Sequence, residues 1–259
     1  MSEAASAPLN GGAFASQAEG HRRWVRICHW LAVASFVTLA VSGVFILMVH
    51  PRLYLGEVGN DLTPALLTLP INNNHRPGEL QRTIAFTEVP GAPVSAERNF
   101  QIFNQNGWAR SLHFLAAWVM VVVGAIYLSV GVVSGHLGRD LLPRPRELSP
   151  SALWQDLKNH LRKHFESSAA GPPYGLFQKL AYTGVVLILL PLMVATGLTM
   201  SPAVTVAYPF LLDLFGGYQT ARTVHFFGFS VLILFLIIHV AMVIATGFAR
   251  QLRAMTWGG

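Results

Sequence analysis

The chain has 259 residues, of which 53% are hydrophobic and 12% are charged, with a mean hydropathy of +0.46 and a net charge of +6. Soluble domains carry about 25% charged residues, so this composition excludes a soluble fold and indicates an all-α protein embedded in a membrane. The single cysteine, Cys28, excludes an intrachain disulfide and a cysteine-based metal cluster. No basic run interleaved with aromatic residues suggests a nucleic-acid partner.

The chain begins with residues 1–20, which are rich in Ala, Ser and Gly and lack the pattern of a signal peptide, so we expect a disordered tail. Four apolar runs follow, each long enough to cross a bilayer. They predict a four-transmembrane-helix bundle within residues 21–250, ahead of a C-terminal tail at 251–259. The predicted spans cover residues 27–49, 108–133, 177–200 and 222–248.

Two long polar segments separate these spans. Residues 50–107 contain six prolines, so long helices are not expected there. Residues 134–176 are basic, and the stretch 149–165 has a capping Ser149, Pro150 and apolar residues at helical spacing. This stretch predicts a helix that lies on the membrane surface or, as the alternative, packs on the ends of the spans.

The distribution of Lys and Arg predicts the orientation, because cytoplasmic loops carry an excess of both. The side that holds both termini and the loop 134–176 has twelve of the 18 basic residues, and the loop 50–107 side has six. We therefore predict a bacterial inner-membrane protein with both termini in the cytoplasm and the loop 50–107 on the outer side.

His225 and His239 lie fourteen residues apart in the fourth apolar run. Fourteen residues rise about 21 Å and turn almost four times, so both imidazoles point to roughly the same side of one helix. Ionisable side chains inside a span are costly and are usually functional. This spacing suits two stacked haems, each bound by one nitrogen from this helix.

Each of these histidines has a candidate partner at a matching depth on another span. His29 and His239 lie in the cytoplasmic half, and His113 and His225 lie near the outer surface. These pairs predict two b-type haems with the four histidines as axial ligands of the iron. Iron held by two imidazoles has no open position, so such haems transfer electrons and bind neither oxygen nor substrate.

The competing interpretation is that a histidine near a span end is an interfacial residue. It explains one histidine well, but it explains poorly four that pair by depth on three helices. His50 is the reserve candidate for the outer haem, and His21, His75, His136, His160 and His164 are expected at interfaces or on the surface. Small residues, namely Ser42, Gly43, Gly124, Ala195, Thr196 and Gly197, permit close approach of a macrocycle or equally of another helix.

The chain resembles the bacterial dihaem cytochrome b family, which supplies membrane subunits to nickel–iron hydrogenases, formate dehydrogenases and thiosulfate reductase-like complexes. The resemblance extends over roughly 22–248. It rests on Arg-Ile-Cys-His-Trp at 26–30, Ser42-Gly43, Arg-Ser-Leu-His at 110–113, Ala-Thr-Gly at 195–197, His225 and His239. The long loop 50–107 and the absence of a recognisable extra span after the fourth are departures from compact members.

The resemblance implies electron transfer between a quinone pool and a periplasmic-side oxidoreductase partner, such as a hydrogenase, a formate dehydrogenase or a molybdopterin enzyme. A quinone would bind beside the haem of His29 and His239, where Arg26, Gln178 and Lys179 are candidates to bond a quinone carbonyl. Arg26 and Lys179 equally suit span anchoring or pairing with haem propionates. The loop 50–107 is long enough to cap the outer haem and contact the partner.

Two further functions are kept open. Small relatives resemble superoxide:quinone oxidoreductases, and Arg110 and Arg222 beside the outer haem could then attract the anion. A haem-free transporter or scaffold is the other, although the sequence lacks the inverted repeat and broken helices that would support it. We expect an electron-transfer subunit, because the sequence has no nucleotide-binding motif or catalytic constellation outside the spans.

Overall fold

A computed structural model describes residues 22–60, 63–71, 107–143, 148–151, 154, 158 and 176–257. Four of its helical segments are long and apolar enough to cross a membrane. They are α1 (Arg23–Val49), α4 (Gly107–Val133), the segment Leu176–Thr199, and α10 (Tyr218–Ala245). The prediction of an all-α membrane protein with four spans is therefore confirmed, and the observed ends lie within four residues of the expected ones.

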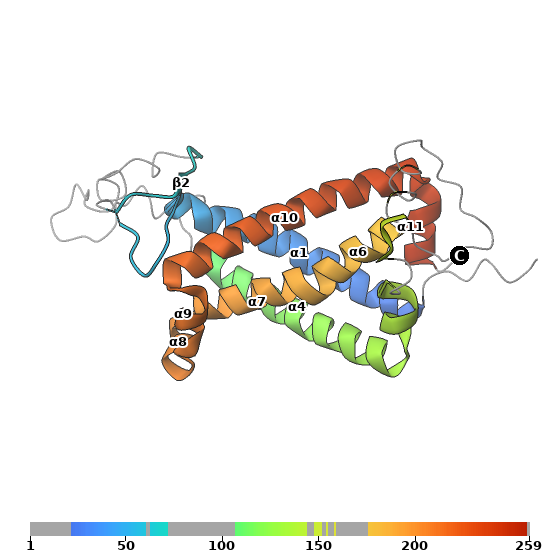
Figure 1. The fold of residues 1–259 in the computed structure, drawn as a ribbon, viewed down its shortest axis with the longest axis horizontal. Helices are drawn as coiled ribbons and strands as arrows, with labels where there is room; N and C mark the ends of the chain where they lie inside the picture. The colour runs from blue at the N-terminus through green and yellow to red at the C-terminus, as the bar shows by residue number, and fades with distance from the viewer. Residues whose placement is uncertain are drawn as a thin grey trace, which may run out of the picture.

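The long helices run side by side along the length of the molecule (Figure 1). α1 packs extensively against α4, and α10 packs against the third span. At one end lie the short strands β1 (Arg52–Leu53) and β2 (Leu67–Thr68) with the short helices α8 (Pro202–Ala207) and α9 (Phe210–Phe215). At the other end lies α11 (Phe248–Thr256). We call these the β end and the α11 end.

The third span is not a uniform α-helix. It consists of α6 (Leu176–Gly184), the π-helical turn η5 (Val185–Leu189) and α7 (Leu190–Thr199). Pro191 sits in the first turn of α7 and has no N–H to donate to the carbonyl four residues earlier. The wider turn supplies another arrangement, in which the Leu190 N–H bonds the Val185 carbonyl. A second π-helical turn, η3 (Leu137–Leu141), follows α4 at the α11 end.

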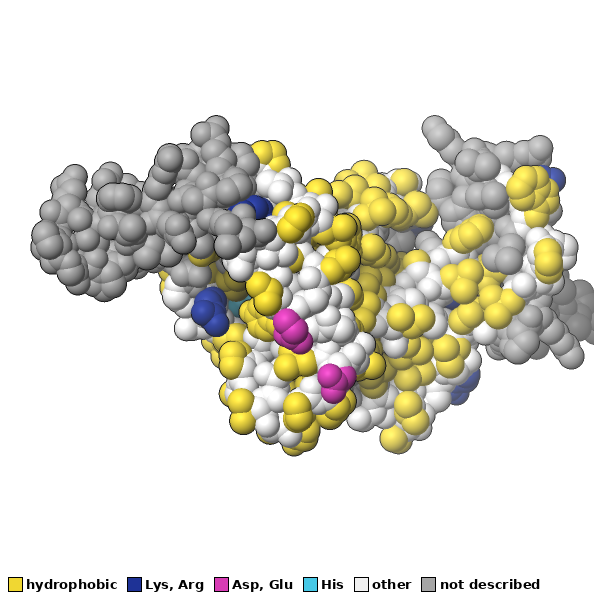
Figure 2. All heavy atoms as spheres, turned by 60° about the vertical axis from the view of Figure 1, so that its left-hand side comes forward, with side chains coloured by type: hydrophobic (Ala, Val, Ile, Leu, Met, Phe, Trp, Pro, Cys, Tyr) yellow, Lys and Arg dark blue, Asp and Glu magenta, His cyan; other side chains and the backbone are white. Residues whose placement is uncertain are grey.

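Apolar side chains cover the outside of the bundle. Only 6–17% of the most hydrophobic part of each span is buried within the protein. Figure 2, which brings the β end forward, shows yellow hydrophobic side chains over much of the visible face and few Lys or Arg. Such a surface suits contact with lipid, where every backbone polar group must be satisfied inside the helix.

At the β end, residues 51–57 are held against the first turns of α10. Thr223 donates its hydroxyl to the Tyr54 carbonyl over 2.6 Å, and the Gly56 N–H donates to the Thr220 hydroxyl over 2.7 Å. Arg222 donates to the carbonyls of His50 and Arg52. β1 and β2 pair antiparallel, with Arg52 opposite Thr68. These contacts fix the start of the loop between the first two spans against the first turns of α10.

At the α11 end, α11 crosses back to the start of α1. Trp30 donates its indole N–H to the Met255 carbonyl over 3.0 Å, and Arg26 donates to the Thr256 carbonyl over 3.3 Å. The last carbonyls of a helix have no partner within it, so these two side chains satisfy groups that the helix itself cannot. They join the two ends of the described chain.

Several elements differ from the expectation. The fourth span ends at Ala245 because the chain turns at Gly247, and residues expected as a tail form α11 instead. α8 and α9 were not expected. The expected tail at 1–20 and most of the expected helix at 149–165 lie outside the described residues, as does most of the loop 50–107. A short β-pair forms in the described part of that loop.

Gly217 tests the contact between the loop and α10. Its φ is +112°, and a Cβ there would lie 2.5 Å from backbone atoms of Gly56, which cannot move aside as a side chain can. Gly216, its neighbour, also has a positive φ of +68° but has open space around it. We predict that Gly217→Ala destabilises the protein by about 2–3 kcal/mol and Gly216→Ala by about 1 kcal/mol. Thermal unfolding in detergent measures both, and equal losses would contradict the close approach.

Candidate haem site

Two of the four predicted ligands meet near the β end. His113 projects from α4 and His225 from α10, and their ring centroids are 6.4 Å apart with the ring planes at 58°. Both side chains are half-buried. They come from different pairs of packed helices, so the site lies between the α1–α4 pair and the α7–α10 pair.

The other two meet toward the α11 end. His29 projects from α1 and His239 from α10, again with ring centroids 6.4 Å apart and the planes at 58°. The structure therefore brings together the same two pairs that the depths in the sequence predict. α10 contributes one imidazole to each pair, and the two pairs share the same separation.

This separation suits one metal ion between the two rings. A metal–imidazole bond is about 2 Å long and the ring centre lies roughly 1 Å beyond the nitrogen, so rings on opposite sides of one ion are about 6 Å apart. Within the described residues no group of three or more His, Cys, Asp or Glu side chains could hold a metal ion. Two imidazoles alone do not complete a coordination sphere, whereas a porphyrin supplies four further nitrogens. The residues present therefore fit a haem at each pair.

The β-end pair is contacted by hydroxyl groups of neighbouring helices. The Ser42 hydroxyl lies 3.0 Å from Nδ1 of His113, and the Thr196 hydroxyl lies 2.9 Å from Nδ1 of His225. Both hydroxyl-bearing residues are fully buried. Each precedes a glycine, Gly43 or Gly197, at which a Cβ would come within 3.5 Å or 3.8 Å of the Cε1 atom of the same imidazole. The absence of a side chain at these glycines leaves room beside the ring.

Aromatic rings surround the α11-end pair. Phe235, one turn before His239 on α10, stacks on its imidazole at 5.8 Å with the planes 18° apart. Tyr182 of α6 approaches the same imidazole edge-on at 6.2 Å. Trp30 lies 5.5 Å from the ring of its neighbour His29. The two pairs thus share their spacing, but hydroxyl groups contact the β-end pair and aromatic rings contact the α11-end pair.

The other described histidines lie elsewhere. His50 follows α1 and stacks on Tyr54 at 5.7 Å, within the loop that covers the β end. His136 contacts Trp24 and Tyr127 at the α11 end. His21, His75, His160 and His164 lie outside the described residues.

The two arginines considered for anion attraction differ in their surroundings. Arg110 is exposed in the first turn of α4. Arg222 is half-buried, and its guanidinium donates to the backbone carbonyls of His50 and Arg52 and to the Gln219 side chain. Arg222 is therefore engaged in holding the loop, and this placement does not favour a role in drawing superoxide from solution.

The three quinone candidates all lie at the α11 end. Arg26 is in the first turn of α1 and bonds the Thr256 carbonyl, while Gln178 and Lys179 are in the first turn of α6. Lys179 is almost fully buried.

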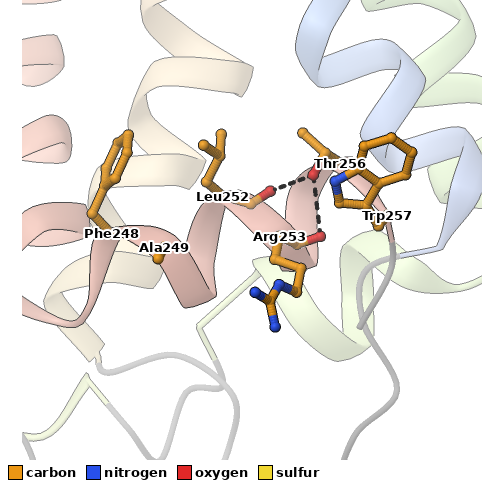
Figure 3. Close-up of a pocket in the computed structure, with 6 residues that line it drawn as sticks. All are labelled: Phe248, Ala249, Leu252, Arg253, Thr256 and Trp257. Carbon is orange, nitrogen blue, oxygen red and sulfur yellow. Dashed lines mark hydrogen bonds between the residues drawn. The ribbon is translucent and has the colours of Figure 1, made fainter.

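An open apolar groove of about 320 Å³ lies along α11 at the same end. It is lined by Phe248, Ala249, Leu252, Arg253, Thr256 and Trp257. Figure 3 shows Phe248 and Leu252 pointing to the same side of the helix and Arg253 to the opposite side. The helix is thus apolar on one side and basic on the other, at the end where the quinone candidates lie.

The contacts of Ser42, Thr196, Tyr182 and Phe235 with the paired imidazoles were not predicted from the sequence. In the sequence, Ser42-Gly43 and Thr196-Gly197 stand out as small residues and as family motifs, without a predicted contact to a histidine. Their shared pattern, a hydroxyl residue followed by glycine in two different spans, is the signal that could have identified them. Tyr182 and Phe235 carry no signal that distinguishes them from other aromatic residues in the spans.

Known proteins give a consistent classification. Residues 20–258 match the prokaryotic cytochrome b561 family. The chain is also 30% identical over 238 residues to the "Putative protein-methionine-sulfoxide reductase subunit YedZ1" of Azospira oryzae, an alignment that covers 92% of this chain and 96% of that protein. With four membrane-spanning helices and imidazoles paired between them, the chain belongs to the prokaryotic cytochrome b561 family of bacterial b-type membrane cytochromes.

Proposed function

We propose that this cytochrome b561-type electron-transfer subunit binds two b haems, one between His29 and His239 and one between His113 and His225. The observation that carries the proposal is the 6.4 Å separation of both imidazole pairs, which matches two rings bound to one iron. When bound, the haems supply reversible one-electron chemistry. The protein's part is to hold each iron between two fixed imidazoles, so that no substrate reaches it.

We further propose that the α11 end faces the cytoplasm and the β end faces the periplasm. In this arrangement residues 21–250 form the membrane domain and both termini are cytoplasmic. Support comes from the Lys and Arg distribution, with twelve basic residues on the terminal side and six on the other. The haem of His113 and His225 then lies beneath the outer loop, whose first residues are held on α10 by hydrogen bonds.

The proposed reaction moves electrons between membrane quinol and an oxidoreductase at the outer face. The name of the Azospira relative, a subunit of a protein-methionine-sulfoxide reductase, supports a partner that reduces methionine sulfoxide in proteins. Reduction of a sulfoxide to a thioether and water takes two electrons and two protons, and a quinol releases the same number of each. We assign the quinone to the α11 end because the partner occupies the other, and because Arg26, Gln178, Lys179 and the open apolar groove of α11 lie there.

Substitution of the paired histidines tests the haem assignment. We expect His225→Ala to remove mainly the haem at the β end and His239→Ala mainly the one at the α11 end, because each loses an axial ligand. His136→Ala is the matched control, since His136 lies outside both pairs. Pyridine haemochrome analysis per mole of protein, with a redox titration, measures the result. Wild-type haem content in both ligand variants would show that other residues bind the haems.

Purification tests the partner. When the chain is purified from its native membranes in mild detergent, an oxidoreductase should copurify with it. After quinol has reduced the haems, addition of protein-bound methionine sulfoxide should reoxidise them through this oxidoreductase. Removal of residues 72–96 should leave the haem spectrum unchanged but release that protein. Removal of residues 2–20 should not release it. Rapid reduction of quinone by superoxide with the purified chain alone would instead support the stand-alone enzyme.

Kinetics of haem reoxidation test the quinone site. We expect Arg26→Ala, Gln178→Ala and Lys179→Ala to slow reoxidation by limiting quinone several-fold while the haem spectra stay unchanged, because a hydrogen bond to a quinone carbonyl is lost. Arg139→Ala is the control, because Arg139 lies at the same end in η3, where it is exposed and bonds the Ser134 carbonyl. If all three candidates react at the wild-type rate in stopped-flow measurements, these residues do not form the site.

A further inference from the structure

Ser42 and Thr196 make the same contact to the two imidazoles of the β-end pair. Ser42 of α1 lies 3.0 Å from Nδ1 of His113 on the packed helix α4. Thr196 of α7 lies 2.9 Å from Nδ1 of His225 on the packed helix α10. Each helix pair of the bundle therefore supplies one histidine and the hydroxyl that touches it.

The direction of these hydrogen bonds follows from where each hydroxyl proton goes. The Ser42 hydroxyl donates to the Thr38 carbonyl over 2.7 Å, and the Thr196 hydroxyl donates to the Leu192 carbonyl over 2.8 Å. A hydroxyl has one proton and two lone pairs, so each oxygen can only accept from the imidazole. Nδ1 of both histidines therefore carries a hydrogen, and Nε2 is the nitrogen left free to bind iron.

Backbone carbonyls support the same direction. The Leu39 carbonyl interacts with the His113 imidazole, and the Met193 carbonyl interacts with the His225 imidazole. A carbonyl can only accept, so each imidazole faces acceptors on this side.

Thr38 and Thr199 show that a hydrogen bond from a hydroxyl to a helix carbonyl does not by itself set Ser42 and Thr196 apart. Thr38 bonds the Ala34 carbonyl and Thr199 bonds the Ala195 carbonyl, each over 2.9 Å. Such bonds to the residue four positions earlier are a common way to satisfy Ser and Thr in helices. Thr199 is also fully buried. Ser42 and Thr196 differ from Thr38 and Thr199 because each adds a contact to an imidazole of the β-end pair.

We propose that Ser42 and Thr196 are positioning residues that fix the tautomer and orientation of His113 and His225 and lower the reduction potential of the haem between them. This inference rests on the proposed ligand assignment. An acceptor on the far nitrogen of a ligand histidine makes the ligand more basic and orients its ring. A more basic ligand stabilises oxidised iron relative to reduced iron, which lowers the potential of that haem.

Removal of either hydroxyl should therefore raise this potential. Partners of ligand histidines are typically worth 10- to 100-fold in metal affinity. We expect a loss of affinity of about tenfold, at the lower end of this range, because the Leu39 or Met193 carbonyl remains beside the imidazole. If this tenfold loss of affinity affects only the oxidised haem, the one-electron reduction potential rises by about 59 mV.

The experiment compares Ser42→Ala and Thr196→Val with Thr38→Val and Thr199→Val. The readouts are a spectroscopic redox titration and the low-spin ferric EPR signal of each haem. We expect the first two variants to raise the midpoint potential and shift the EPR signal of the β-end haem alone, and the two controls to leave both unchanged. Thr196→Ser, which keeps the hydroxyl, should restore the wild-type values. An unchanged haem at His29 and His239 verifies folding in each variant.

The outcomes separate the two claims. If His113→Ala and His225→Ala lose the β-end haem while Ser42→Ala and Thr196→Val behave like the controls, the ligands are right and the positioning role is wrong. If the two histidine variants keep both haems, the ligand assignment itself fails. If Thr196→Ser shifts the potential as far as Thr196→Val, packing rather than the hydroxyl is responsible, and the inference is overturned.

Discussion

The hydrocarbon interior of a bilayer offers no hydrogen-bonding partners, so every polar atom in the four spans must find one within the protein. Main-chain atoms find theirs by forming helices. Where Pro191 removes a donor, a π-helical turn provides another arrangement. Ser42 and Thr196 each donate to a helix carbonyl and lie within hydrogen-bond distance of an imidazole nitrogen. The same requirement thus determines the backbone geometry and the surroundings of the candidate haem site.

The two ends of the bundle meet this requirement differently. At the β end, Arg222 and Thr223 bond carbonyls of the loop after α1, so the first turn of α10 and the loop satisfy one another. At the α11 end, Arg26 and Trp30 bond the last carbonyls of α11. Both sets of contacts link distant parts of the chain close to an imidazole pair. α1 and α10, which carry three of the four histidines, are therefore linked near both ends by side chains that bond backbone carbonyls.

Much of this arrangement could be predicted from the sequence because it depends on period and depth. The apolar runs predicted four spans, and the interval between His225 and His239 predicted one helix face with two imidazoles. Their pairing with His113 and His29 followed from counting residues inward from each span end. The short helices α8, α9 and α11 were missed because six to nine residues give too little periodicity. The contacts of Ser42 and Thr196 were missed because they depend on how two helices are rotated against each other, which the sequence of one helix does not specify.

The fourteen-residue interval on α10 has an electrical consequence. It separates the two imidazole pairs by about 21 Å along the helix, roughly two-thirds of a hydrocarbon core about 30 Å thick. On the proposed assignment, an electron that passes from His29 and His239 to His113 and His225 crosses that fraction of the transmembrane voltage. One charge across 100 mV corresponds to about 2.3 kcal/mol, so the passage is worth about 1.6 kcal/mol. With a negative interior the outward direction is favoured, so reduction of an outer partner would draw on the energised state of the membrane.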